Sequence, residues 1–348
     1  MRLLGRAGSR FALLILAALA LASCGGSAEQ PTPSRSGLVS IGAGLRGPAG
    51  MKASVYASGL RNVSAFALDE RGRLWVTTSA AANHSHDGVY LIIGAGARPL
   101  KVISGLKGPL GLTWSGDELF VASMGRVDAF GGLRGNRFTE RRLVLEEPAG
   151  HGWNDNLVKA PDGRLVMSIS ANCDHCTPRS PWSGSIVSFK PDGSDVRFYA
   201  RRLRAGYGMA YVPGTSDLLV SMNQRNDLGA RTTGDALGLV REGDDWGFPA
   251  CYGQGGNACK GVPKAVAVLD KHAAAGGLTV SDGSALVSEW MLGKVLRVQL
   301  TKTGSGYTGT VTTWLTGLKN PLAVATSTDG SVLVGDWGSG TIYRIARG

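Results

Sequence analysis

Basic side chains recur at one position of a repeated pattern in this sequence. The position lies 12 to 14 residues before a short strand-like stretch, and the side chains at it are those of Arg61, Lys107, His151, Arg204, His272 and Lys319. Lys and Arg number 37 and His 5 among 348 residues, so six basic residues at one position are not expected by chance. Guanidinium and ammonium groups bind carboxylates, and an imidazole can also accept a proton near neutral pH. The pattern therefore predicts an anion site combined with acid–base chemistry.

The stretch that follows each basic residue consists of a turn, a strand ending in Val or Met, and then small or polar residues. Its six copies align on Val76, Val121, Met167, Val220, Val287 and Val334. Spacings of roughly 45 to 67 residues are typical of four-stranded propeller blades with loops of variable length. With 52 Gly and 14 Pro in 348 residues, turns are too frequent for a helical protein.

The two ends of the chain predict how the ring closes. The sixth repeat ends after its third strand, and an unassigned strand, Lys52 to Leu60, precedes the first repeat. That strand can complete the last blade, so that no edge of the ring stays unpaired. We therefore expect an all-β protein, a six-bladed β-propeller closed by its N-terminal strand. A β-sandwich, the alternative, predicts neither the repeat count nor the matching ends.

In such a ring the basic residues precede the innermost strands at one mouth of the axis. Together they predict a positively charged axial pocket, which is costly unless an anion occupies it. A bare divalent metal, as in a lactonase-type propeller, would favour carboxylates instead.

The N-terminal residues predict export. Arg2, Arg6 and Arg10 precede an apolar run that ends in "LASC", with Cys24 as its last residue. We expect a lipoprotein signal peptide over 1–23, the alternative being an ordinary signal peptide. A flexible linker over 24–50 and the propeller over 51–348 would follow. Acylated at Cys24, the protein would be anchored at a membrane surface, on the periplasmic side or at the cell surface.

Export also bears on charge and cysteines. The net charge is +11 and falls by three with the signal, but an exported protein is not expected to bind nucleic acid. Four cysteines remain, and disulfides Cys173–Cys176 and Cys251–Cys259 are the simplest of three possible pairings. A zinc site built from all four thiolates is the alternative.

Several stretches resemble one known family from about Gly59 onward. They are "GHGWNDNLVKAPDGRLVMSIS", "IVSFKPDGSDVRFYARRLRAGYGMAY", "DLLVSMNQRNDLG", "GDALGLVREGDDWGFPACYG" and "PLAVATSTDGSVLVGDWGSGTIYRI". The chain resembles the soluble pyrroloquinoline-quinone (PQQ) sugar dehydrogenases of the glucose/sorbosone type. The resemblance implies a PQQ- and calcium-dependent oxidoreductase that passes hydride from an aldose or related sugar to the quinone and then to an external electron acceptor.

The resemblance also implies roles for individual residues. His151 would be the catalytic proton acceptor, and Arg204 would clamp the cofactor. Arg61, Lys107, His272, Lys319 and Asn223 would complete the cofactor site, and backbone carbonyls of Gln224 and Arg225 would hold calcium.

The chain departs from the family pattern at some of these positions. Ala205 follows Arg204 where the family has asparagine, and "DALG" (235–238) replaces a run with glutamate and asparagine. His151 also lies one residue further from its strand than in the family. These changes favour, as an alternative, a non-catalytic propeller that binds an anionic or sugar ligand at the cell surface. A lactonase-type hydrolase is a third alternative.

Overall fold

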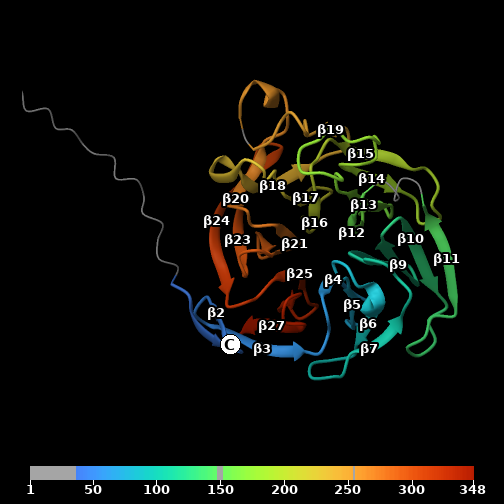
Figure 1. The fold of residues 1–348 in the computed structure, drawn as a ribbon. Coiled ribbons are helices and arrows are strands. Elements are labelled where there is room, and N and C mark those ends of the chain that lie inside the picture. The colour runs from blue at the N-terminus through green and yellow to red at the C-terminus, as the bar shows by residue number, and fades with distance from the viewer. Residues whose placement is uncertain (1–36, 147–151, 254) are drawn as a thin grey trace, which may run out of the picture. The chain divides into compact units, whose positions relative to one another are not determined.

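The computed structural model describes residues 37–146, 152–253 and 255–348, which form six β-sheets around one axis (Figure 1). The first blade contains β4 (Val63–Leu68), β5 (Leu74–Thr78), β6 (Gly88–Ile92) and β7 (Leu100–Ile103), with the 3-10 turn η1 (His84–His86). The second contains β8 (Gly111–Ser115), β9 (Glu118–Ser123), β10 (Arg126–Gly131) and β11 (Glu140–Leu145). The third contains β12 (Asn154–Lys159), β13 (Leu165–Ile169), β14 (Ser185–Phe189), β15 (Arg197–Arg201) and the short β19 (Asp244–Asp245).

The remaining three blades complete the ring. The fourth contains β16 (Gly206–Tyr211), β17 (Leu218–Met222), β18 (Gly234–Val240) and β20 (Ala265–Lys271), with turns η3 (Gly229–Arg231) and η4 (Asn257–Cys259). The fifth contains β21 (Ala275–Ser281), β22 (Ser284–Glu289), β23 (Lys294–Thr303) and β24 (Gly306–Thr316). The sixth contains β25 (Pro321–Thr326), β26 (Val332–Asp336), β27 (Thr341–Arg347) and β3 (Met51–Ala57).

The innermost strands line the axis. Strands β4, β8, β12, β16, β21 and β25 each contact the next one in this order, and β25 contacts β4 again. The ring is therefore closed, and the predicted six-bladed propeller is confirmed.

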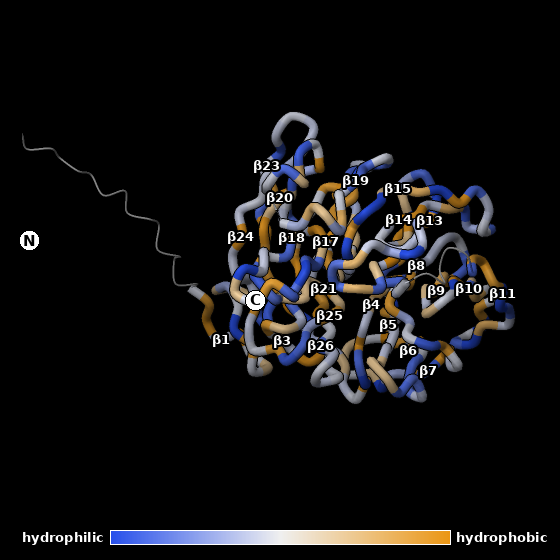
Figure 2. Tube along the Cα trace, turned by 45° about the horizontal axis from the view of Figure 1, so that its top comes forward, coloured by the Kyte–Doolittle hydropathy of each residue, from blue (hydrophilic) through white to orange (hydrophobic). Residues whose placement is uncertain are grey.

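The second strands carry the repeat found in the sequence. All six aligned residues lie on β5, β9, β13, β17, β22 and β26, and each is fully buried. The core lies between neighbouring blades, where Trp75, Phe120 and Phe189 are also fully buried, and Figure 2 shows apolar residues mainly along the strands. Burying one such Val stabilises the fold by roughly 1.5–3 kcal/mol, so each blade contributes through the same position.

Turn chemistry sets the ends of these strands. Between β12 and β13, Gly163 adopts a φ of 87° and the Asp162 carboxylate accepts a hydrogen bond of 3.0 Å from the Arg164 backbone N–H. Asp329 accepts the same kind of bond, also 3.0 Å long, from the Ser331 N–H in the sixth blade. The Asp-Gly turns therefore fix the register of the hairpins that line the axis.

Ring closure takes place as predicted. β3 pairs antiparallel with β27, with Lys52 opposite Ala346 and Met51 opposite Arg347. The N-terminal strand thus covers the edge that the sixth repeat would leave unpaired.

The structure corrects the prediction of a flexible linker over 24–50, because the C-terminal part of that segment is folded. β1 (Val39–Gly42) and β2 (Leu45–Gly47) form a hairpin, and β2 extends the fifth blade beyond β24. Ile41 and Leu45 are buried in a cluster with Trp314, which is the physical reason for the order of this segment. The predicted signal peptide and Cys24 lie outside the described residues.

Both predicted disulfides are present. Cys173 is bonded to Cys176 and Cys251 to Cys259. The four-thiolate zinc site is therefore wrong. Across the described residues, no helix has the length and apolarity needed to span a membrane.

Candidate functional site

A pocket of about 280 Å³ lies at one end of the propeller axis, and we call it the axial pocket. It is built from residues at the starts of innermost strands and from residues just after second strands. All six blades contribute to it, and its largest or most polar side chains are those of Trp153, Asp155, Tyr207, Asn223, Trp290 and Trp337. The predicted mouth is therefore present, but its lining is mostly apolar.

β-Bulges shape the floor of this pocket. The register of the innermost strand shifts between Asn154 and Asn156 in the third blade and between Gly206 and Met209 in the fourth. Asp155 and Tyr207 are thus bulged residues, which have no single partner on the neighbouring strand. The fifth blade has a similar bulge between Ala275 and Leu278. Because bulges turn side chains away from the sheet, they bring these residues into the axial pocket.

Asp155 is the one carboxylate among the side chains that line the axial pocket. It is only 4% exposed, and it accepts a hydrogen bond from the Ser170 hydroxyl. Desolvation by burial raises the pKa of Asp155 to about 7, although the Ser170 hydrogen bond and the charge of Arg204 act in the opposite direction. Burial and the Asp155 carboxylate also raise the pKa of the Tyr207 hydroxyl.

Three indole rings border the same space. Trp290 and Trp337 pack edge to face, with ring centroids 5.5 Å apart at 69°. The Trp337 indole N–H donates to the Ser79 carbonyl at 2.9 Å, which fixes its ring between the sixth and first blades. Trp153, from the third blade, is 36% exposed. The pocket therefore offers apolar aromatic surface beside one carboxylate.

The predicted cations lie around the pocket rather than in it. Arg61, Lys107, His272 and Lys319 are exposed and do not line the axial pocket. The expectation of a positively charged axial pocket is therefore wrong for the described residues. The physical reason is that, in blades two to six, the residues reaching the axis lie two to four positions further along the chain than the predicted cation, around the start of the innermost strand.

Buried carboxylates position the loops that carry these cations. Asp87 accepts hydrogen bonds from the backbone N–H groups of Gly108 and Ala80, both at 2.8 Å. Asp336 accepts from the N–H groups of Lys319 at 2.9 Å and Asn320 at 2.8 Å. Lys107 and Lys319 thus stand on fixed loops. Among the described residues, neither ammonium group has a hydrogen-bond or ion-pair partner, so both are available to an anion.

Asp235, from the "DALG" run, is a buried carboxylate that positions the loops at the fourth blade through backbone hydrogen bonds. It accepts hydrogen bonds from the N–H groups of Gln224 at 2.8 Å and Ala275 at 2.9 Å. Burial raises the pKa of Asp235, while these two bonds act to lower it. Asp235 therefore joins the Gln224 loop to the start of β21.

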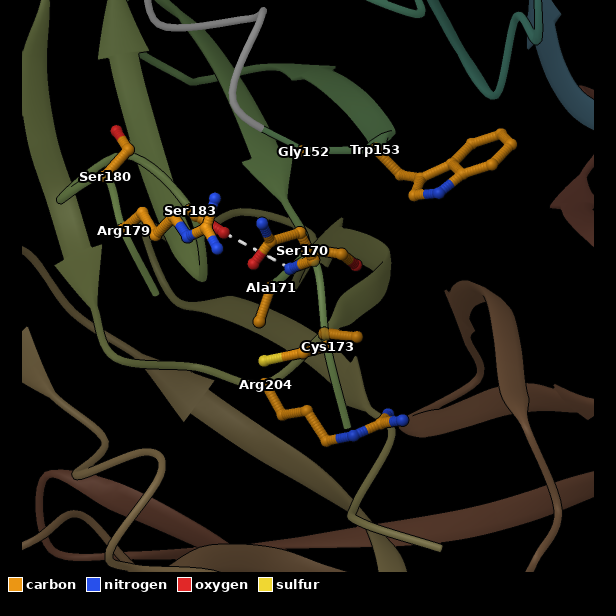
Figure 3. Close-up of a pocket in the computed structure, with 11 residues that line it drawn as sticks. Gly152, Trp153, Ser170, Ala171, Cys173, Arg179, Ser180, Ser183 and Arg204 are labelled. Atoms are coloured by element: carbon orange, nitrogen blue, oxygen red, sulfur yellow. Dashed lines mark hydrogen bonds between the residues drawn. The ribbon is translucent and has the colours of Figure 1, made fainter. Parts of the chain in front are cut away.

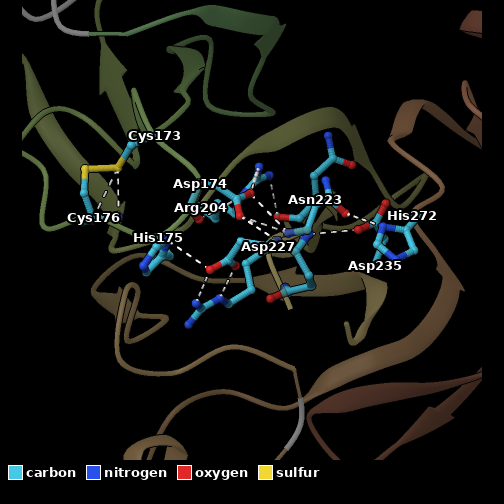
Figure 4. Close-up of polar contacts among 12 residues, drawn as sticks. Cys173, Asp174, His175, Cys176, Arg204, Asn223, Asp227, Asp235 and His272 are labelled. Carbon is cyan, nitrogen blue, oxygen red and sulfur yellow. Dashed lines mark hydrogen bonds and ion pairs between the residues drawn. A yellow bond between two sulfur atoms is a disulfide. The ribbon is translucent and has the colours of Figure 1, made fainter. Parts of the chain in front are cut away.

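Arg204 is engaged by a carboxylate. Its guanidinium contacts Asp174 Oδ1 through Nε at 3.0 Å and through Nη2 at 2.5 Å, and Nη1 lies 3.5 Å from the Asn223 carbonyl (Figure 4). Asp174 also accepts hydrogen bonds from the backbone N–H groups of Asn226 and Asp227. Asp174 lies between the two cysteines of the first disulfide, so this closed loop holds it against Arg204.

A larger pocket of about 690 Å³ adjoins the axial pocket at Trp153, and we call it the side pocket (Figure 3). Its polar lining includes the guanidinium groups of Arg179 and Arg204 and the hydroxyls of Ser180 and Ser183. In the described part of the chain, Arg179 has no hydrogen-bond or ion-pair partner. The side pocket therefore carries the cationic character that was expected at the axis.

The loop predicted to bind calcium follows β17. Asn223 lines the axial pocket, and Gln224 Oε1 accepts a hydrogen bond of 3.1 Å from the Gly253 N–H. The Arg225 guanidinium pairs with Asp227 and lies 4.6 Å from the centre of the Tyr252 ring. The carbonyl oxygens of Gln224 and Arg225 accept no hydrogen bond from described residues, so they remain available as ligands.

Asp174, His175 and Asp227 come close enough together to be considered as a metal site. The Arg225 guanidinium, however, hydrogen-bonds to Asp227 and lowers the pKa of that carboxyl, and Arg204 pairs with Asp174. Two guanidinium groups already balance the two carboxylates. The cluster is therefore an ion-pair network, in which His175 Nδ1 also lies 3.2 Å from Asp227 Oδ2.

His151 lies outside the described residues, and its predicted role stays a prediction.

Three residues that matter for the two pockets were not predicted from the sequence: Asp155, Arg179 and Tyr207. The "WNDN" cluster (153–156) was a visible signal for Asp155, since polar residues at the start of an innermost strand are unusual for a packed sheet.

Fold and site together define a six-bladed β-propeller with a pocket at one end of its axis. No protein-family model matches the sequence, and no curated protein matches it either. Solved structures do match. The holo form of the PQQ domain of pyranose dehydrogenase from Coprinopsis cinerea has a TM-score of 0.74 at 15% identity, covering 87% of this chain and 97% of that one.

The structures of two bacterial proteins also resemble this chain along most of its length. The PQQ-bound aldose sugar dehydrogenase from Streptomyces coelicolor has a TM-score of 0.68 at 17% identity and covers 86% of this chain and 100% of that one. A putative oxidoreductase (glucose dehydrogenase) from Thermus thermophilus has a TM-score of 0.67 at 19% identity, with coverages of 85% and 100%. At these identities the likeness shows a shared fold, and that fold agrees with the family that the sequence resembles.

Proposed function

We propose that the protein is a PQQ- and calcium-dependent oxidoreductase that oxidises an aldose or a related sugar of the glucose/sorbosone type. The observation that carries this proposal is the pair of adjoining pockets at one mouth of the propeller. One pocket is aromatic with a buried hydrogen-bond acceptor, and the other carries two guanidinium groups. The fold shared with the PQQ domain of a pyranose dehydrogenase and with a PQQ-bound aldose sugar dehydrogenase supports it further.

The cationic groups fit a tricarboxylate quinone. Arg204 and Arg179 in the side pocket would bind its carboxylates, because guanidinium groups match carboxylate geometry. Arg61, Lys107, His272 and Lys319 would add positive charge at the rim, and Asn223 would contribute its amide. When bound, the quinone supplies the acceptor for the hydride that leaves the sugar carbon.

Calcium would be bound at the loop after β17. The carbonyl oxygens of Gln224 and Arg225, which accept no hydrogen bond from the described residues, would supply two ligands, whereas Ca²⁺ takes about six to eight oxygens. The remaining ligands would come from the cofactor and from water, since the carboxylates of Asp174 and Asp227 are already paired with arginines.

His151 is the proposed proton acceptor for the anomeric hydroxyl. In support, its chain neighbours Gly152 and Trp153 both line the side pocket, and Trp153 also lines the axial pocket. An imidazole with an ordinary pKa near 6.5 is suited to accept a proton at neutral pH. An external electron acceptor would then reoxidise the cofactor.

Lipid anchoring through Cys24 is part of the same proposal. The mature chain would be exported and held at a membrane surface, where it would meet sugars and the electron acceptor outside the cytoplasm.

A non-catalytic sugar- or anion-binding propeller is the second candidate. It is favoured by the ion pair of Arg204 with Asp174, which occupies two nitrogens of the expected cofactor clamp. Incubation of purified protein with PQQ and calcium, followed by dye reduction with a panel of aldoses, separates the two candidates. We expect dye reduction that needs both cofactors. Tight PQQ or sugar binding with no dye reduction by any sugar would favour the second candidate.

A further inference from the structure

A second cavity lies on the propeller axis next to the axial pocket, and we call it the central cavity. It has a volume of about 230 Å³, and residues from all six blades line it. Along β4 its lining extends from Ser64 to Leu68, which is nearly the whole strand. Leu68 and Val158 are partly exposed near the far ends of β4 and β12. The central cavity therefore extends from the axial pocket toward the opposite face of the propeller.

The walls of the central cavity are polar, although most of its side chains are apolar. Each innermost strand stands at the end of its sheet, so the backbone N–H and C=O groups along its other edge have no partner strand. These edges meet around the axis, because each innermost strand contacts the next. Backbone polar groups inside a protein need hydrogen-bond partners, and 230 Å³ has room for several water molecules. The central cavity is therefore suited to a column of water.

Tyr207 joins the two cavities, since it lines both the axial pocket and the central cavity. Its hydroxyl is buried and has no hydrogen-bond partner among the described residues. Burial raises the pKa of this hydroxyl, and the nearby Asp155 carboxylate raises it further. Buried polar groups are nearly always hydrogen-bonded, so water in the central cavity is the partner expected for the Tyr207 hydroxyl.

The Ser168 hydroxyl lies beside the same two residues. Ser168 is opposite Asn156, directly after the bulge that contains Asp155. A Cβ atom on Gly206, the residue before Tyr207, would lie 3.8 Å from the Cβ of Ser168. The Ser168 hydroxyl is buried and, within the described ranges, has no hydrogen-bond partner either. Three groups that can exchange a proton thus lie together between the axial pocket and the central cavity.

The proposed reaction must release protons at this place. Oxidation of a sugar hydroxyl to a carbonyl removes two electrons and two protons, and an acceptor that takes only electrons leaves both protons to the protein. A ligand in the axial pocket would lie between the pocket floor and the mouth. Asp155, which is 4% exposed, would then have no open way to solvent on that side.

We propose that Asp155 and Tyr207 pass these protons from the axial pocket to water in the central cavity, which leads to the opposite face. Asp155 takes up a proton from the pocket and gives it to the Tyr207 oxygen, directly or through Ser168, while the Tyr207 O–H releases its own proton to the water. Both groups then return to their starting state. A carboxyl with a pKa of about 7 can take up and release a proton near neutral pH. The inference rests on the proposed function and extends it to the path of the protons.

The test follows proton release by full-length protein loaded with PQQ and calcium. An aldose is the donor, and ferricyanide, which takes only electrons, is the acceptor. In stopped-flow mixing, a pH indicator in weak buffer measures the protons and ferricyanide absorbance measures the electrons. The wild type should release two protons per sugar, as fast as ferricyanide is reduced. Tyr207→Phe removes the hydroxyl but keeps the ring, and in the first turnover its proton release should be slower than ferricyanide reduction by about tenfold or more.

Two further variants separate the central cavity from the mouth. Asn156→Leu replaces a polar residue of the central cavity by an apolar one and should produce the same delay. Tyr211→Phe is the matched control, because it makes the same substitution in β16 at a residue that lines neither cavity, and its proton release should match that of the wild type. If Tyr207→Phe and Asn156→Leu release protons as fast as ferricyanide is reduced, the proposal is overturned while the proposed function stands.

A crystal structure of the full-length protein without PQQ gives a second readout, which needs no activity. Ordered water should lie within hydrogen-bond distance of the Tyr207 hydroxyl and continue along the central cavity. A central cavity without ordered water at Tyr207 overturns the proposal even in an active enzyme. A hydrated cavity in a protein that oxidises no sugar with PQQ overturns the proposed function, and the proton path with it.

Discussion

Replacing Asp155 by asparagine should change the pH dependence of stability in a way that reports its burial. The carboxyl is 4% exposed and desolvation raises its pKa to about 7, against an ordinary value of 3.8. A folded-state pKa above the unfolded one means that the native state binds the proton more tightly. The stabilisation from protonation is therefore fully present below about pH 3.8 and is lost as pH rises through about 7.

The size of the effect follows from the same difference in pKa. At 1.36 kcal/mol per pKa unit, the gap from 3.8 to about 7 corresponds to roughly 4 kcal/mol. Asparagine is close in shape and carries no charge, so Asp155→Asn should be more stable than the wild type at pH 8, by up to about that amount. At pH 5 most of Asp155 is already protonated in the native state, and the gain should be much smaller.

Urea unfolding at pH 5, 6, 7 and 8 measures this directly for the wild type and for Asp155→Asn, with Asp162→Asn as control. Glu289, whose pKa is also raised to about 7 by desolvation and the charge of Asp270, should leave some pH dependence in Asp155→Asn. Glu289→Gln in the Asp155→Asn background should remove most of the rest. If Asp155→Asn is no more stable than the wild type at pH 8, or if its advantage is the same at pH 5, then burial does not raise the pKa of Asp155 in the folded protein.

The other predictions concern the proposed enzyme. His151→Ala should lower kcat by roughly 10²–10⁴-fold in the dye assay while leaving PQQ affinity within about twofold; unchanged kcat would remove His151 from the mechanism. Arg204→Ala should weaken PQQ binding by about tenfold or more, since it removes a guanidinium and leaves Asp174 facing the anion, and calorimetry checks this; equal affinity would place the cofactor elsewhere. Chelation of calcium should abolish dye reduction reversibly without changing the circular dichroism spectrum, and activity that survives chelation would contradict a calcium site at Gln224 and Arg225. Cys24→Ala should release the protein from membranes in fractionation, whereas unchanged association would contradict the lipid anchor.

The architecture could be predicted from the sequence because its signals are local. Each second strand combines a turn with a short apolar run, and Val76 and Val334 show the same pattern in the first and the last repeat of the chain. Closure could be predicted because a missing strand at one end matched a surplus strand at the other. Both disulfides could be predicted because cysteines only a few residues apart pair most simply with each other.

The N-terminal hairpin could not be predicted in this way. "VSIGAGLRG" (39–47) has the glycine content of a linker, and only Ile41 and Leu45 pack into the core. Its turn uses Gly42, Ala43 and Gly44, all with positive φ. An alanine such as Ala43 is not expected to have a positive φ, so the sequence predicts a flexible segment rather than a hairpin.

The composition of the axial pocket depends on β-bulges, which could not be predicted from the sequence. Counting back from each repeat finds the loops at the mouth, but it does not find the bulges, which decide that Asp155 rather than a basic residue reaches the axis. The ion pair of Arg204 likewise depends on Asp174, which lies 30 residues earlier in the chain and is held there by a disulfide loop. Contacts of this kind are set by tertiary structure.

We propose that this propeller transfers hydride from a sugar to a bound quinone. Anaerobic addition of an aldose to protein loaded with PQQ and calcium, followed by the absorbance of the cofactor, measures that transfer in a single turnover. We expect the cofactor spectrum to change to that of the reduced quinone, with one sugar oxidised per bound cofactor, and the change to be slowed in His151→Ala. A protein that binds PQQ and calcium but whose cofactor spectrum stays unchanged with every aldose tested would contradict the claim.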